Sequence, residues 1–97
     1  MARYVVLVNW TEQGIRSVKE TVSRSKAFRQ AAKSMDCEIA DICWTLGPYD
    51  IVSIVDAPND EVVTRLGLIL GMQGNVKTTT LRAFGESEME RIIKSLP

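Results

Sequence analysis

Apolar positions along the chain switch between a two-residue and a 3.6-residue period, which predicts strands that alternate with helices. Residues 3–10 are dense in Tyr, Val and Leu on both faces, as is typical of a central strand. A helical period runs through residues 15–35, and Thr11 is a suitable N-cap for it. The weak helix formers at 21–23 predict a kink there, followed by a firmer helix over 23–35.

The second half of the chain predicts a strand pair, a helix, a strand and a last helix. In order these are strands 37–46 and 49–56, a helix capped by Asn59 or Asp60, strand 76–84, and a helix opened by a capping box of Ser87 and Glu90. Gly47-Pro48 is a strong turn signal, and so short a connection makes its two strands antiparallel. The order β-α-β-β-α-β-α predicts an α+β, ferredoxin-like fold: a four-stranded antiparallel sheet with a C-terminal helix.

Two crossover helices can cover only one face of such a sheet, so the other face needs its own cover. In strand 76–84, Leu81 and Ala83 alternate with Thr78, Thr80 and Arg82, and we expect the apolar pair to face the helices. Strand 3–10 is apolar on both sides, so the second face still carries much apolar area. A second copy packed sheet to sheet would cover it, which predicts a homodimer or higher homo-oligomer. The C-terminal helix is the alternative cover.

The length of 97 residues predicts a single domain over 1–97, small enough for its stability to depend on a partner subunit. Twelve Lys+Arg balance twelve Asp+Glu, which argues against nucleic acid as a partner. Lys26, Arg29 and Lys33 share a helix face that we interpret as a solvated surface. Without a recognisable secretory leader or a long apolar run, we expect a cytoplasmic protein with no membrane partner.

The absence of histidine narrows the possible chemistry. It excludes Ser-His-Asp and Cys-His nucleophile systems, a His-ligated haem and any His-based metal site. Cys37 and Cys43 would lie about 20 Å apart on one strand, too far for a disulfide. The sequence also shows no carboxylate cluster and no glycine-rich phosphate loop, so we expect neither a metal nor a cofactor.

The residues best suited to chemistry lie around the Gly47-Pro48 turn. The Tyr49 hydroxyl and the Asp50 carboxylate could orient a ligand or form a weak acid/base pair; alternatively, Tyr49 packs at a strand end and Asp50 caps the turn. Trp10 and Trp44 could line an aromatic pocket, or anchor the core or an interface. Arg82 could clamp a carboxylate, or pair with an acid at the sheet edge.

Several segments resemble, in order, the GYD-domain family. They are residues 4–15, Trp44 to Asp50, Ala57-Pro58, and Gly74 to Phe84, within a resemblance that runs from about residue 4 to 96. The family motif corresponds to Gly47, Tyr49 and Asp50, and Val22 stands where many relatives carry proline. The resemblance implies a bacterial protein that forms a dimeric α/β barrel related to the ferredoxin-like fold. It implies no activity, and no catalytic residue carries over.

Three functions are compatible with these observations. The first is a non-catalytic small-molecule-binding module, with a pocket between sheet and helices or inside the barrel, near the five candidates Trp10, Trp44, Tyr49, Asp50 and Arg82. The second is a cofactor-independent enzyme on a small apolar substrate, with Tyr49 and Asp50 as a proton relay. The third is a structural self-assembling protein, which predicts that no cavity reaches the roughly 300 Å³ typical of a ligand site.

Overall fold

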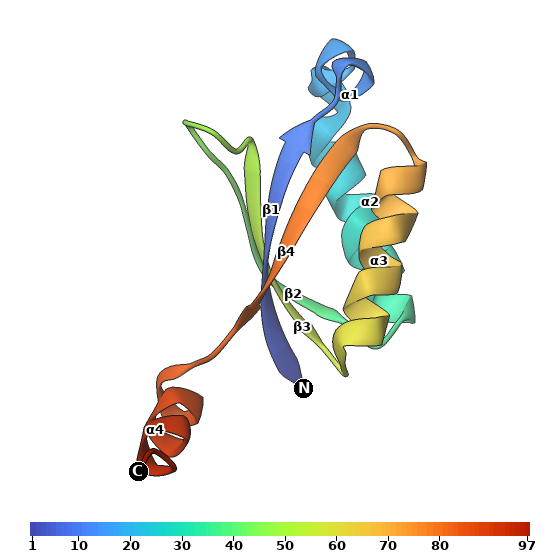
Figure 1. Ribbon diagram of the computed structural model, residues 1–97. Helices are drawn as coiled ribbons and strands as arrows, with labels where there is room; N and C mark the ends of the chain where they lie inside the picture. The colour runs from blue at the N-terminus through green and yellow to red at the C-terminus, as the bar shows by residue number, and fades with distance from the viewer.

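The computed structural model describes all 97 residues and contains a single four-stranded sheet (Figure 1). The elements are β1 (Ala2–Trp10), α1 (Glu12–Arg16), the 3₁₀ turn η1 (Val18–Glu20), α2 (Thr21–Ser34), β2 (Glu38–Trp44), β3 (Ile51–Ala57), α3 (Asp60–Met72), β4 (Val76–Ala83) and α4 (Glu86–Lys94). The strand order is β2-β3-β1-β4, and every neighbouring pair is antiparallel. This confirms the predicted α+β, ferredoxin-like arrangement.

Helices α2 and α3 lie side by side on one face of the sheet (Figure 1). The hydrophobic core fills the space between them and the sheet. Its buried members are Tyr4, Val6, Val8, Ala32, Cys37, Ile39, Val55, Ala57, Val63 and Leu66. Both cysteines are free, Cys37 buried and Cys43 exposed, and burial raises the pKa of the Cys37 thiol. No helix combines the length and the apolar character that crossing a membrane requires.

The break in the first helical region lies earlier than predicted. Helix α1 ends at Arg16, η1 follows, and α2 begins at Thr21, so residues 21–23 form the first turn of a helix instead of a kink. The Arg24 guanidinium explains the position, because it donates hydrogen bonds to the Ser17 carbonyl and hydroxyl and to the Gly14 carbonyl. These bonds hold the first turn of α2 against the end of α1, at the break between the two helices.

The start of α1 is joined to the loop before β4. The Thr11 hydroxyl accepts from the Gly14 N–H at 3.1 Å, as an N-cap should, and donates to the Gly74 carbonyl at 2.6 Å. The Thr11 N–H donates to the Asn75 carbonyl at 3.0 Å. Gly14 is buried against this loop, and a Cβ at its position would lie 1.9 Å from the Asn75 carbonyl oxygen. Only glycine fits there without moving the backbone.

The prediction for the faces of β4 was wrong. Leu81 pairs with Val5 and Arg82 with Tyr4, and directly paired residues point to the same side of a sheet. Because Tyr4 faces the core, Arg82 lies on the helix side and Leu81 and Ala83 lie on the opposite side. Alternation alone was ambiguous because both faces of the sheet are apolar.

The sheet face opposite the helices carries an apolar patch that no part of the chain covers. We call it the open face and define it by Val5, Leu7, Val52, Ile54 and Leu81. At its rim the Arg3 guanidinium forms two hydrogen bonds, each 2.9 Å long, with the Asp56 carboxylate. These bonds hold the pKa of the Asp56 carboxyl below its ordinary value.

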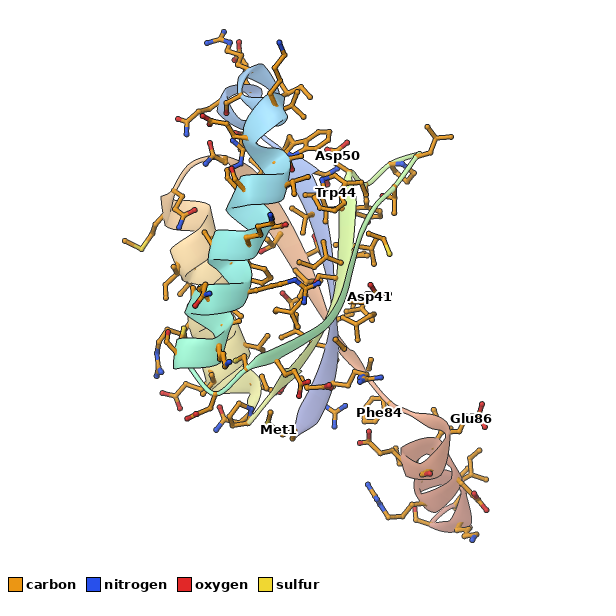
Figure 2. The ribbon with its side chains drawn as sticks, turned by 180° about the vertical axis from the view of Figure 1, so that it is seen from behind. Met1, Asp41, Trp44, Asp50, Phe84 and Glu86 are labelled. Atoms are coloured by element: carbon orange, nitrogen blue, oxygen red, sulfur yellow. The ribbon has the colours of Figure 1, made fainter.

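Helix α4 does not cover the open face. It lies beyond the end of β4, clear of the sheet, in both views (Figures 1 and 2), and none of its residues is buried. It begins at Glu86 with Gly85 as its N-cap, so the predicted capping box of Ser87 and Glu90 was wrong. The Gly85 N–H donates instead to the Glu88 carboxylate at 3.5 Å.

Replacing Gly14 with alanine tests the contact between α1 and the loop before β4. We expect Gly14→Ala to lower the free energy of unfolding by about 2 kcal/mol or more, because the new methyl meets backbone instead of a flexible side chain. Gly71→Ala is the matched control: it is also helical, and its Cβ would meet nothing within 4 Å. The control should be neutral or gain up to about 1 kcal/mol. Equal thermal unfolding of both variants would contradict this reading.

Candidate functional site

A cavity of about 70 Å³ lies between α2 and the sheet, near the end of the sheet where β1 finishes. Val6, Val8 and Phe28 are among its mostly apolar lining residues, and Arg24, Ser25 and Ser53 are among the polar ones. The volume has room for about five water molecules or a fragment of a few heavy atoms. It is well below the roughly 300 Å³ expected of a site for a larger ligand.

The polar group that stands out at this cavity is the indole N–H of Trp10. Trp10 lines the cavity, and its Nε1 atom is fully buried with no hydrogen-bond partner. A buried donor without an acceptor costs about 1–3 kcal/mol. The indole N–H is therefore an unsatisfied donor buried beside the cavity.

Arg24 brings a positive charge to the same cavity. Its side chain is only 22% exposed, and its guanidinium is held by Ser17 and Gly14 and by an ion pair with Glu20 at 4.0 Å. One sign of this role is present in the sequence, because at helical spacing Arg24 lies off the face shared by Lys26, Arg29 and Lys33. That the side chain lines a cavity depends on contacts distant in sequence.

Trp44 lies at the same end of the sheet but reaches the cavity only through a neighbour. It is 41% exposed, and its indole N–H donates to the Thr21 hydroxyl at 3.0 Å. Thr21 is a lining residue, so this bond connects the end of β2 to the first turn of α2 beside the cavity. Figure 2 shows Trp44 and Asp50 near each other at this end of the sheet, as the pairing of Trp44 with Ile51 requires.

Asp50 holds the turn between β2 and β3 against the end of β1. Its carboxylate accepts from the Trp10 backbone N–H at 2.9 Å, and its own N–H donates to the Val8 carbonyl at 2.9 Å. Gly47 has φ +116°, in the left-handed region that favours glycine. Two of the three family-motif positions, Gly47 and Asp50, thus have a visible role in shaping this turn.

Tyr49 is joined to the turn through its backbone alone. Its carbonyl accepts from the Thr45 hydroxyl at 2.6 Å, and its own hydroxyl forms no hydrogen bond within the chain. No hydrogen bond therefore connects the two members of the hypothetical proton relay, Tyr49 and Asp50. The Asp50 carboxylate is engaged by the backbone of Trp10 instead.

Arg82 lies apart from the other four candidates. It pairs with Tyr4, six residues along β1 from Trp10, a separation of about 20 Å. Its guanidinium forms an ion pair with Glu88 at 3.0 Å and lies 4.5 Å from the centre of the Phe84 ring. The ion pair lowers the pKa of the Glu88 carboxyl. Arg82 thus pairs with an acid, but the acid comes from the first turn of α4 beyond the sheet, not from the sheet edge.

The chain has no group of three or more His, Cys, Asp or Glu side chains placed to hold a metal ion. Few ionisable side chains are buried. Tyr4 donates its hydroxyl proton to Asp60 at 2.5 Å, and burial is the main reason that its pKa is raised. This pair connects β1 to the first turn of α3, at the opposite end of the sheet from the cavity.

Substitutions at the turn separate its structural role from a chemical one. Asp50→Ala leaves the Trp10 N–H without its acceptor, and we expect it to lower the free energy of unfolding by about 1–2 kcal/mol. Tyr49→Phe removes a hydroxyl with no partner in the chain and should change stability by less than about 0.5 kcal/mol. Chemical denaturation of both variants measures the difference. A larger loss in Tyr49→Phe would show that its hydroxyl has a structural role after all.

Comparison with known proteins places the chain in a family. The model of the GYD domain matches residues 4–93, nearly the whole chain. A protein of Thermus thermophilus, named glutamine synthetase and cystathionine beta-lyase binding protein, is 30% identical over 90 residues, which cover 92% of this chain and 95% of that protein. The chain belongs to the GYD domain family.

Proposed function

We propose that this chain is a non-catalytic protein-binding module that forms a homodimer through its open face and binds a metabolic enzyme. The observation that supports the dimer is the uncovered apolar patch of the open face. Leu81, Val5 and Ile54 form one row across β4, β1 and β3, and Leu7 and Val52 continue the patch in the next row. If they stayed uncovered, these side chains would give the monomer an exposed apolar surface that favours association or aggregation.

A second copy is the occupant that the open face fits. A two-fold axis needs a single self-complementary surface, and a mainly apolar patch complements itself without charge matching. Of the charged groups on this face, Arg3 and Asp56 satisfy each other, while Glu38, Asp41 and Lys77 lie around the apolar patch. Two sheets packed face to face would bury both patches in a layer about 10 Å thick.

The enzyme partner is suggested by the relative from Thermus thermophilus, whose name says that it binds glutamine synthetase and cystathionine beta-lyase. We extend that property to this chain, for which an enzyme of the same kind is the candidate partner. The cavity beside Trp10 is smaller than a ligand site, which is in keeping with a protein-binding module. A larger hollow of about 420 Å³ lies at the opposite end of the sheet, but it is more open to solvent and its lining is mainly polar, with Arg29, Lys33, Asp36 and Glu38 among the residues. The self-assembly hypothesis from the sequence is thereby retained as the dimer within this proposal.

The experiment compares Leu81→Asp, on the open face, with Leu68→Asp, on the exposed side of α3, where the leucine is 63% exposed. We expect Leu81→Asp to weaken the homodimer by at least about tenfold in sedimentation equilibrium, because a carboxylate would be buried in an apolar contact. Leu68→Asp should leave the dimer unchanged. A monomeric wild type at micromolar concentration, or equal behaviour of the two variants, would refute the dimer.

Binding to the enzyme is measured separately, by interferometry with purified glutamine synthetase and cystathionine beta-lyase from the same organism as this chain. We expect at least one of them to bind the immobilised wild-type protein. If neither binds, the enzyme part of the proposal is wrong, and the dimer is judged by the leucine variants alone.

The buried N–H of Trp10 favours a second candidate function, a small-molecule-binding module. Its ligand would have few heavy atoms and would carry a hydrogen-bond acceptor, such as a carboxylate, for the indole N–H. Trp44, Tyr49 and Asp50 lie at the same end of the sheet without lining the cavity, while Arg82 is too distant to take part.

Trp10→Phe tests this candidate because it removes the indole N–H and retains most of the apolar surface. Native mass spectrometry of purified wild-type protein should show a small adduct that is absent from the variant. If neither protein carries an adduct and the variant is more stable by about 1 kcal/mol or more, the N–H is only an unsatisfied donor and the cavity is no ligand site.

A further inference from the structure

Helix α4 has an apolar face for which its own chain provides no contact. Met89, Ile92, Ile93 and Leu96 recur at the spacing of one helix face and are 38–64% exposed. The opposite side carries Ser87, Arg91 and Lys94, and Lys94 pairs with Glu90 at 3.4 Å. A helix of nine residues is too short to be stable through its backbone alone, so this face needs a surface to pack on.

We propose that α4 is an arm exchanged between two copies of the chain, so that its apolar face packs on the copy seated on the open face. The inference rests on the homodimer of the proposed function and adds a second contact to it. In both views α4 lies beyond the end of β4, on the side of the sheet away from α2 and α3 (Figures 1 and 2). The arm therefore extends toward the space that a second copy would occupy.

Contacts at the start of α4, where the chain leaves β4, hold the helix in this position. The Arg82 guanidinium pairs with Glu88 at 3.0 Å and lies over the Phe84 ring at 4.5 Å. The other Glu88 carboxylate oxygen accepts from the Gly85 N–H. These contacts connect β4 to the first turn of α4 across the two residues between them, so the helix projects in a defined direction before any partner arrives.

The size of the open face also calls for a second contact. Four strands about 4.8 Å apart that rise about 3.3 Å per residue give the sheet a projected footprint on the order of 500 Å². A stable interface buries roughly 800 Å² on each partner. Two exchanged arms would enlarge the interface on both copies and would cover the apolar face of each α4.

Charge favours a second copy over a membrane surface as the occupant. The segment from Glu86 to Lys94 carries three glutamates against Arg91 and Lys94. Helices that lie on anionic membranes are typically rich in Lys and Arg on the polar face. The helix here has a net negative charge, so anionic headgroups would repel it.

The experiment uses the full chain and two variants that each add one carboxylate to α4. Ile93→Glu places it on the apolar face, at a side chain that is 57% exposed, and Ser87→Glu places it on the polar side. We expect Ile93→Glu to weaken the dimer by about tenfold or more in sedimentation equilibrium and Ser87→Glu to change it by less than about twofold. Both variants should melt like the wild-type monomer at high dilution, because no residue of α4 is buried in the chain.

A second measurement establishes which chain the arm contacts. Isotopically labelled and unlabelled wild-type proteins are mixed, allowed to exchange subunits and treated with an amine cross-linker. We expect links from Lys94 to join labelled with unlabelled chains. Links from Lys94 confined to one chain would show that α4 folds onto its own sheet, and would overturn the proposal.

The remaining outcomes separate the arm from the proposed function. If Leu81→Asp dissociates the dimer and Ile93→Glu does not, the open-face dimer stands and the exchanged arm is refuted. If Leu81→Asp has no effect, the open-face dimer is itself refuted, and the arm proposal falls with it. Sedimentation of the wild-type chain with phosphatidylglycerol vesicles, abolished by Ile93→Glu with the dimer intact, would assign α4 to a membrane surface and also overturn the proposal.

Discussion

The whole structure depends on the apolar character of both faces of β1. On one side Tyr4, Val6 and Val8 form the centre of the core beneath α2 and α3; on the other, Val5 and Leu7 form the centre of the open face. A central strand of this kind has to be covered twice. The chain provides one layer of helices, and the need for the second layer connects the fold to its proposed association.

The two ends of β1 make different contacts. At its end, the Trp10 N–H donates to the Asp50 carboxylate in the turn before β3, and the Thr11 N–H donates to the Asn75 carbonyl in the loop before β4. The cavity and the unpartnered indole N–H lie here. At its beginning, Tyr4 contacts Asp60 and Arg82, and Arg82 in turn holds the base of α4. The cavity beside Trp10 and the base of α4 thus lie about a strand length apart.

Local signals were sufficient for the order of elements and for the caps at Thr11 and Asn59, because each depends on residues within one turn. Two predictions failed where the cause is distant in sequence. The faces of β4 are decided by its register with Tyr4 and Val5, and the helix break is decided by Arg24 reaching back to Gly14. Of the candidate site, the contact between Asp50 and Trp10 required the pairing of β1 with β3, and the pairing of β1 with β4 placed Arg82 far away.

The central position of β1 also has a consequence for how the molecule is made. The first strand of the chain pairs with β3 and with β4, so that Arg3 meets Ala83, eighty positions later in sequence. Strand pairs this distant in sequence form slowly, because the chain loses the entropy of closing a long loop before the stabilising contacts can form. Until then β1 exposes two unpaired edges and two apolar faces, the combination most prone to aggregate. The newly synthesised chain therefore needs protection from aggregation through β1 that the folded sheet, in which both edges of β1 are paired, does not.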